Sequence, residues 1–384
     1  MQVIEKTEDL RRLCEVFREA PFVTVDTEFM RERTYYSQLC LIQVATTEDA
    51  AIIDPLAPGI DLEPLLALLA DESVVKVFHA ARQDLEIFYR LMGRVPQPLF
   101  DTQIAAMACG YGDQVGYEPL VRAVTGAQVD KGSRFTDWSK RPLSEKQLTY
   151  ALGDVTHLVD VYLALQKKLA ETGRTAWVAE EMAVLDEPTL YFTSPETAWQ
   201  RLKLRNIRPK DMGAIVQLAA WREREAQQKD VPRARVVKDE AITEIARAAP
   251  TTVAELGALR GVPTGFERSR SAAGLLEAVA AGKAMSRDDI PQKETSGQNQ
   301  PAPADVVDLL RVLLKRQSEL HGVAPKLLAS SADIEAIALS DDANVPAMRG
   351  WRREVFGDLA LKLKHGAVSL GLKGKSVTLI NHKA

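Results

Sequence analysis

The sequence is poor in cysteine, has no long apolar run and carries no strong excess of charge. Its three cysteines, Cys14, Cys40 and Cys109, have neither the pairing of a disulfide framework nor the spacing of a zinc site. No apolar stretch approaches the roughly 20 residues of a membrane span, and the charged N-terminus has no signal-peptide core. We therefore expect a cytoplasmic protein that has no membrane as a partner.

The charge balance decides little about partners. The formal net charge is −4 and the isoelectric point is near 5.9, whereas binding to nucleic acid depends on local basic patches. Hydrophobic residues make up 46% and charged residues 27% of the chain, as in ordinary globular proteins. A chain of 384 residues is longer than most single domains, so we expect two or three.

Strand patterns are confined to the N-terminal half. Residues 22–28 (FVTVDTE), 38–46 (QLCLIQVAT) and 50–54 (AAIID) predict three strands joined by short links, and hence an antiparallel meander. Helical periodicity follows, interrupted by one more strand at 74–80 (VVKVFHA). We therefore expect an α/β domain over residues 1–190, with a mixed sheet flanked by helices.

The remaining chain predicts helices only. A polar, proline-containing linker at 286–304 (SRDDIPQKETSGQNQPAPA) separates two helical domains, 197–285 and 305–384. A shift of 92 positions brings their hydrophobic patterns into register, with Leu218 on Leu310 and Ile242 on Ile334. This match suggests an internal duplication.

Four acidic residues occupy positions that normally face a protein interior. Asp26 and Glu28 lie two apart on the first predicted strand and so share a face. Asp84 and Asp154 fall on the apolar stripes of predicted helices, and Tyr150 lies one turn before Asp154.

Each of these residues alone has an ordinary explanation, such as a helix cap, a strand end, the partner of a buried arginine or, for Tyr150, a core aromatic. Four acids together favour bound divalent cations, because unpaired buried carboxylates are costly and hard cations prefer oxygen ligands. Two such ions would suit phosphoryl displacement.

At this point the residues carry a family resemblance. Asp-x-Glu on a strand, a later Asp and then Tyr-x-x-x-Asp resembles the DEDDy branch of 3′-5′ exonucleases, and the segments VDTEFMRERTYYSQLCLIQVAT, FHAARQDLEIF and DWSKRPLSEKQLTYALGDV closely resemble the ribonuclease D family. The segment WREREAQQKDVPRARVVKDEAITEIARAAPTTVAELGALRG resembles the HRDC domain, and residues 305–384 resemble a degenerate second copy. The resemblance implies a ribonuclease H-like α/β exonuclease domain followed by two all-α HRDC-type domains.

The resemblance also implies roles for the acids. Two divalent metal ions, Mg²⁺ or Mn²⁺, would be bound by Asp26, Glu28, Asp84 and Asp154. Tyr150 would orient the attacking water, and the product would be a nucleoside 5′-monophosphate. A sister branch carries His five residues before the last Asp; here that position is Thr149, which favours the tyrosine branch.

Four further residues are candidates for substrate binding: Phe29, Gln43, Trp138 and Arg141. Phe29 would either stack on the terminal base or pack beneath the strand end. Gln43 would hydrogen-bond either substrate or a backbone group. Trp138 and Arg141 suit stacking and phosphate contact, although their segment also has the features of an ordinary helix start.

Other polar residues have simpler explanations. We expect His79 to be a hydrogen-bonded structural residue and Asp101 to be a helix cap. The run 199–210 (WQRLKLRNIRPK) holds five basic residues and no acid, and would either bind phosphates or be a solvated surface between domains.

The resemblance implies a monomeric 3′-5′ exoribonuclease that trims tRNA precursors and other small structured RNAs at single-stranded 3′ ends. Two alternatives stay open. The same metal chemistry would serve a 3′-5′ exonuclease on single-stranded DNA, because only contacts to the 2′-OH would distinguish the two. A catalytically inactive RNA-binding adaptor is the other, and the intact set of acids with Tyr150 argues against it.

Overall fold

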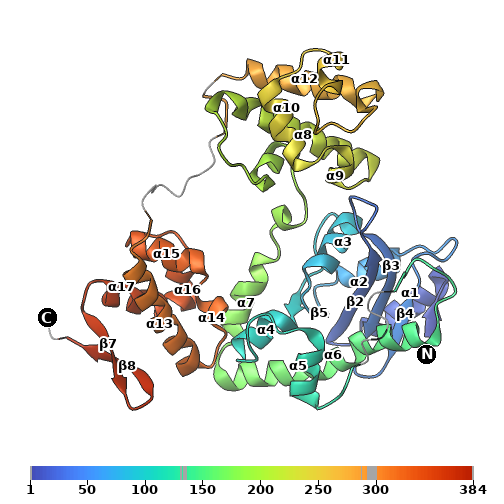
Figure 1. Cartoon of the computed structure of the whole chain (residues 1–384). Coiled ribbons are helices and arrows are strands. Elements are labelled where there is room, and N and C mark those ends of the chain that lie inside the picture. Colours follow the sequence, from blue (N-terminus) through green and yellow to red (C-terminus); the bar gives the residue numbers. More distant parts are fainter. Residues whose placement is uncertain (1, 130–131, 133–135, 287, 292–300, 383–384) are drawn as a thin grey trace.

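The computed structural model describes residues 2–129, 132, 136–286, 288–291 and 301–382. It has an N-terminal α/β domain, a first helical domain that stands away from it, and a C-terminal domain beside helix α7 (Figure 1). Within this described part, no helix combines the length and apolar character that crossing a membrane requires.

The α/β domain contains a six-stranded mixed sheet in the order β1-β4-β3-β2-β5-β6. Its strands are β1 (Gln2–Ile4), β2 (Phe22–Met30), β3 (Gln38–Ala45), β4 (Ala50–Ile53), β5 (Val75–Phe78) and β6 (Leu99–Asp101). Strands β2, β3 and β4 form the predicted antiparallel meander, whereas β1, β5 and β6 pair in parallel with β4, β2 and β5. The three-residue strands β1 and β6 were not predicted, because three residues show no measurable alternation.

Helices cover both faces of this sheet. They are α1 (Thr7–Phe17), α2 (Glu63–Leu69), α3 (Arg82–Met92), α4 (Thr102–Ala108), α5 (Tyr117–Thr125), α6 (Glu145–Thr172) and α7 (Thr175–Val184). Helices α1 to α3 bury apolar residues against Val23 and Val25 of β2. Helices α4 to α7 share the other core with Phe22, which points to the opposite face because strand side chains alternate.

The first helical domain has its own core. It contains α8 (Met212–Lys229), α9 (Arg233–Val236), α10 (Asp239–Ala248), α11 (Val253–Gly257) and α12 (Ser271–Ala284). The C-terminal domain begins with α13 (Ala304–His321), α14 (Pro325–Leu328) and α15 (Ser331–Leu339). Helices α13 and α14 begin and end 92 positions after α8 and α9, and α15 begins 92 positions after α10, as the predicted duplication requires.

The two helical domains then diverge. After α16 (Gly350–Arg352), a π-helical turn (Arg353–Gly357) and α17 (Asp358–Lys364), the chain ends in a hairpin of β7 (Val368–Lys373) and β8 (Ser376–Asn381), so residues 305–384 are not wholly helical as expected. Moreover, one apolar core runs from α4–α7 into this domain. Residues 287 and 292–300 of the predicted linker lie outside the described residues, and the described remainder of it up to α13 forms no helix or strand.

Candidate active site

Three of the predicted acids meet where α6 crosses β2. The position of the helix is set in part by Thr24 of β2, whose hydroxyl donates a hydrogen bond to the carbonyl of Val155 at 3.0 Å. Asp154 is the preceding residue and therefore comes over the strand segment that carries Asp26 and Glu28. One carboxylate oxygen of each of these three acids lies within 4.8 Å of the other two.

Asp84 reaches the same region from the first turn of α3, but it is not a member of this three-acid group. It is buried, and the hydroxyl of Thr27 donates a hydrogen bond to its Oδ1. The turn before α3 is held by Asp101, whose carboxylate accepts from the backbone N–H groups of Ala80 (3.0 Å) and Ala81 (2.9 Å). The same carboxylate caps α4 through the N–H of Gln103, which confirms the prediction that Asp101 is a cap.

The acids disfavour one another's ionisation. Burial raises the pKa of Asp26 well above its usual value, and the Asp154 carboxylate raises it further. Burial also raises the pKa of Asp84, with the charge of Asp26 as the next cause. Asp26 is therefore within electrostatic range of both Asp154 and Asp84, and ionising all of them costs free energy that a bound cation would offset.

Tyr150 lies one turn before Asp154 on α6, and both side chains line the cleft. Burial, followed by the charges of Asp154, Glu28 and Asp26, raises the pKa of Tyr150. The phenol therefore stays protonated and acts as a hydrogen-bond donor, not as a phenolate base.

A cleft of about 1250 Å³ opens over these residues. The four acids, Tyr150 and Phe29 all line it, so Phe29 is placed where a base could stack on it. Gln43 is different. It pairs across the strands with Asp26, but its side chain is fully buried and its amide has no hydrogen-bond partner within the protein. The side chain of Gln43, which lies on β3, is therefore not open to the cleft, and its contact with substrate stays a prediction.

The side chains of Trp138 and Arg141 make contacts within the protein. Trp138 is buried and its ring lies 6.1 Å from that of Tyr150, so it supports the tyrosine from behind. The guanidinium of Arg141 donates to both oxygens of Asp54 (2.5 and 2.6 Å) and to the carbonyls of Trp138, Lys140 and Cys40. These five bonds use all five N–H donors of an arginine, so none remains for a phosphate. Arg141 therefore has no donor left for a phosphate, whereas Trp138, although buried, lines the cleft, and its contact with substrate stays a prediction.

Two cleft residues had no place in the predicted site. Tyr117 lines the cleft, and its hydroxyl donates to the carbonyl of Gly153 at 2.8 Å, next to Asp154. His79 also lines the cleft, and its Nδ1 lies 2.9 Å from the hydroxyl of Thr102. Burial lowers the pKa of His79, which agrees with the expected structural role of a hydrogen-bonded, neutral imidazole. No local sequence pattern identifies Tyr117, because only the tertiary fold brings it to Asp154.

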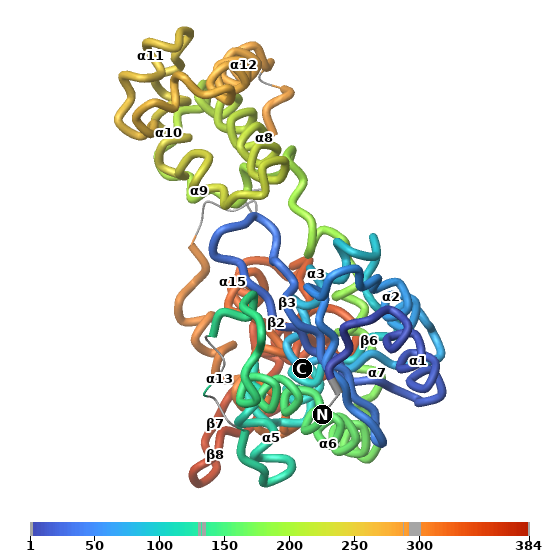
Figure 2. Tube along the Cα trace, turned by 90° about the vertical axis from the view of Figure 1, so that its right-hand side faces the viewer, coloured from blue at the N-terminus to red at the C-terminus, as the bar shows by residue number. Residues whose placement is uncertain are grey.

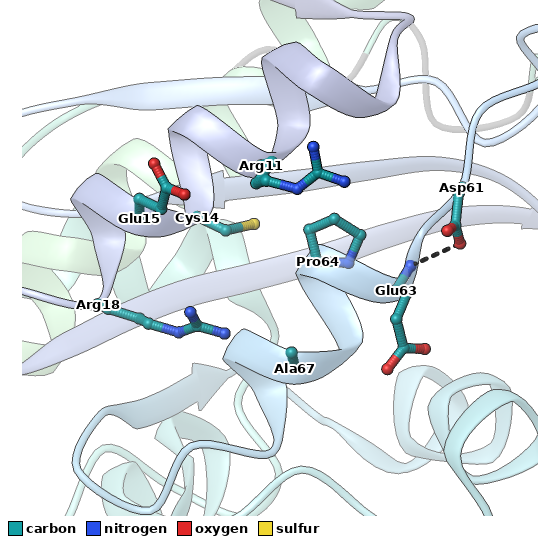
Figure 3. Close-up of a pocket in the computed structure, with 8 residues that line it drawn as sticks. All are labelled: Arg11, Cys14, Glu15, Arg18, Asp61, Glu63, Pro64 and Ala67. Atoms are coloured by element: carbon teal, nitrogen blue, oxygen red, sulfur yellow. Dashed lines mark hydrogen bonds between the residues drawn. The ribbon is translucent and has the colours of Figure 1, made fainter.

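A second hollow, of about 300 Å³, lies between α1 and α2 (Figure 3). Its walls carry Arg11, Glu15, Arg18, Asp61 and Glu63, so acids and arginines are mixed in it. None of the predicted site residues lines it. The predicted catalytic residues therefore line the cleft over β2 and not this second hollow.

Comparisons with known protein families agree with this geometry. A family model described as 3′-5′ exonuclease matches residues 1–170, and a model described as HRDC domain matches residues 211–279.

Several curated relatives match over nearly the full length. Ribonuclease D of Granulibacter bethesdensis is 50% identical over 98% of this chain and 96% of its own, and ribonuclease D of Nitrobacter hamburgensis is 50% identical over 98% and 99%. The crystal structure of Escherichia coli RNase D, described as an exoribonuclease involved in structured RNA processing, superposes with a TM-score of 0.82 at 33% identity. That superposition covers 95% of this chain and 98% of the other.

Proposed function

We propose, from the premise that the chain belongs to the ribonuclease D family of 3′-5′ exoribonucleases, that it trims the single-stranded 3′ ends of small structured RNAs, tRNA precursors among them. The observation that carries the proposal is the cluster of Asp26, Glu28 and Asp154 in an open cleft, with Asp84 beside Asp26. Each turnover would hydrolyse the terminal phosphodiester and release a nucleoside 5′-monophosphate.

The donor set fits two divalent ions. Asp26, Glu28 and Asp154 would hold one, and Asp26 with Asp84 would hold the other, because Asp26 is within electrostatic range of both Asp154 and Asp84. All donors are carboxylates, the ligands that Mg²⁺ and Mn²⁺ prefer. When bound, such ions lower the pKa of a water and stabilise the charge on the attacking and leaving oxygens.

The protein's own groups would do the positioning. The protonated hydroxyl of Tyr150 would orient the attacking water, while Trp138 packs near its ring. Phe29 would stack on the terminal base. Gln43 lies directly across the strand pair from Asp26 and is buried, so it would not contact RNA in this arrangement.

The proposal also covers the cellular location and the oligomeric state. All three cysteines, Cys14, Cys40 and Cys109, are free and buried, which suits the reducing cytoplasm. We propose that the active form is a monomer.

The experiment that tests this function follows a 5′-labelled RNA with a folded, tRNA-like body and a short 3′ tail. Wild type and Asp26→Asn are each incubated with Mg²⁺, Mn²⁺ or EDTA. Support would be a ladder that shortens from the 3′ end, stops at the folded body and is absent in the variant and in EDTA. Shortening of a DNA tail but not of RNA would instead favour the DNA exonuclease, and binding without shortening under either metal would favour the inactive adaptor.

A further inference from the structure

The loop between β2 and β3, residues 31–37, joins the active site to the first helical domain. It continues directly from the strand that carries Asp26 and Glu28, and residues 31–34 line the cleft. Its far end reaches the first helical domain close to α9, as both views show (Figures 1 and 2). Movement of that domain would therefore be transmitted to one wall of the cleft.

The contact between them is a specific polar cluster around Tyr35. The hydroxyl of Tyr35 donates to Glu223 of α8 and accepts from Arg233 (2.8 Å) and Gln227 (3.2 Å). Arg233 also forms two bonds to the buried carboxylate of Glu223, at 2.6 and 2.5 Å, and lies 4.6 Å from the centre of the Tyr35 ring. A buried carboxylate paired in this fork geometry fixes the phenol in one position.

Asp230 fixes the main chain of the same loop. One oxygen of its carboxylate accepts the backbone N–H groups of Tyr35 (3.1 Å) and Tyr36 (3.0 Å). From the other side, the guanidinium of Arg90 on α3 lies 3.8 Å from the centre of the Tyr36 ring. The loop is thus held between α3 and α8. We call the set Tyr35, Glu223, Gln227, Asp230 and Arg233 the Tyr35 cluster.

Two arginines of this loop face different situations. Arg31 forms a two-bond ion pair with Glu86 of α3, at 3.0 and 2.8 Å. Arg33 is exposed and lines the cleft, and no ion pair to it is found among the described residues, although the charge of the Asp137 carboxylate is within electrostatic range. It lies five residues beyond Glu28, and five residues span at most about 18 Å. An exposed guanidinium at that place is suited to a phosphate of a strand whose end lies at the acids.

We propose that Arg33 binds the phosphodiester backbone of the RNA on the 5′ side of the scissile bond, and that the first helical domain positions Arg33 through the Tyr35 cluster. The proposal rests on the proposed function and adds to it a role for the helical domain inside the active site. Asp230 is a positioning residue in this scheme, since it acts on Arg33 through the loop backbone.

The test uses the full-length protein and five variants: Arg33→Gln, Asp230→Gly, the double variant of these two, Asp230→Asn and, as a control, Arg12→Gln on the exposed face of helix α1. Asp230 ends α8 with a left-handed backbone (φ 48°, ψ 50°). Glycine tolerates this conformation while removing the acceptor, and asparagine tolerates it while keeping an acceptor oxygen. The substrates are a single-stranded RNA 12-mer and the p-nitrophenyl ester of thymidine 5′-monophosphate, each at several salt concentrations.

We expect Arg33→Gln and Asp230→Gly to raise KM for the 12-mer about tenfold relative to KM for the ester, a typical loss for one coupled contact. Loss of one phosphate contact should also lower the slope of log affinity against log salt by about 0.7 for a single strand. Asp230→Asn should restore most of the affinity, Arg12→Gln should match wild type, and the double variant Arg33→Gln/Asp230→Gly should be little worse than either single one. Amide exchange of Tyr35 and Tyr36 should be faster in Asp230→Gly than in wild type.

Additive effects in the double variant, or an unchanged KM and salt slope in Arg33→Gln, would overturn the proposal. So would unchanged amide exchange at Tyr35 and Tyr36 in Asp230→Gly. If wild type failed to shorten the 12-mer at all, the proposed function would be wrong, whereas strand binding and amide exchange would still decide whether the helical domain positions Arg33.

Discussion

Replacing Asp26 by asparagine should stabilise the protein when no divalent metal is present. The carboxylate of Asp26 has acidic neighbours within 4.8 Å, and two unit charges at that separation repel by about 1 kcal/mol in a water-like medium or about 3.5 kcal/mol at an effective dielectric constant of 20. Asparagine keeps the shape and removes the charge. Relief of such strained active-site groups typically gains about 0.5–2 kcal/mol, which raises the melting temperature of a domain of this size by about 1–8 °C.

The pH dependence has a defined sign. The folded pKa of Asp26 is raised above its unfolded value of about 3.9, so the folded state binds more protons than the unfolded state between these two values. The stability that Asp26 contributes is therefore greatest at low pH and falls as the pH rises through the folded pKa. The advantage of Asp26→Asn should vanish near pH 4 and should grow as the pH rises toward and through the folded pKa of Asp26.

Thermal unfolding by calorimetry in EDTA and in Mg²⁺ measures both effects. Mg²⁺ at one hundred times its dissociation constant should raise the free energy of unfolding of wild type by about 2.7 kcal/mol. The same concentration should raise that of Asp26→Asn much less. The stability difference between the two proteins should therefore become smaller or change sign. Asp160→Asn, an exposed acid on the same helix α6, is the matched control and should behave as wild type. An Asp26→Asn protein that is less stable than wild type in EDTA at pH 7, or that gains as much from Mg²⁺, would refute the reasoning.

Three further predictions test other parts of the site. Tyr150→Phe should lower kcat about 100-fold, as expected for a misplaced water, with little change in KM, and steady-state kinetics on RNA will check this. Arg141→Met should lower the free energy of unfolding by about 3 kcal/mol, because it leaves the Asp54 carboxylate unpaired, while KM for RNA stays unchanged; a large rise in KM would restore the phosphate-binding hypothesis. Lys76 is buried with its ammonium bonded to three carbonyls, and burial lowers its pKa to about 8. Its stability contribution relative to Lys76→Met should therefore be fully present above the unfolded pKa of about 10.4 and be lost as the pH falls through about 8, which denaturant unfolding at several pH values will measure.

The acids and the meander could be predicted because their signals are local. Alternation along β2 places Asp26 and Glu28 on one face, and helical periodicity places Asp154 on the inward stripe of α6. The burial of neighbouring residues depends on tertiary contacts and could not be predicted from the local sequence. Gln43 and Trp138 carry groups that bind nucleic acids elsewhere, yet both side chains are buried, Trp138 against Tyr150 and Ala151 of α6. Arg141 could not be assigned from sequence, because its partner Asp54 lies 87 positions away.

The domain count shows the same limit. Helical periodicity and the 92-residue shift predict two similar helical units. They do not predict which surface each unit packs against, because a hydrophobic pattern contains no information on tertiary contacts. Thus Trp177 of α7 stacks on Trp351 of the C-terminal domain at 4.2 Å, and the apolar core continues across this contact. Two segments that have separate patterns along the chain are one packed unit in space.

The two helical domains make different contacts with the exonuclease domain, and the residues at aligned positions explain the difference. Under the shift of 92, Glu223, Asp230 and Arg233 correspond to Lys315, Gly322 and Pro325. The second copy therefore lacks the carboxylates and the guanidinium that hold Tyr35 in the first. Its hydrogen-bond acceptors are backbone carbonyls instead of carboxylates. The carbonyls of His321 and Gly322 accept hydrogen bonds from Arg174, at the start of α7.

The first helical domain therefore holds the β2–β3 loop through charged side chains of α8 and α9, whereas the C-terminal domain packs on α7 through backbone carbonyls and the shared apolar core.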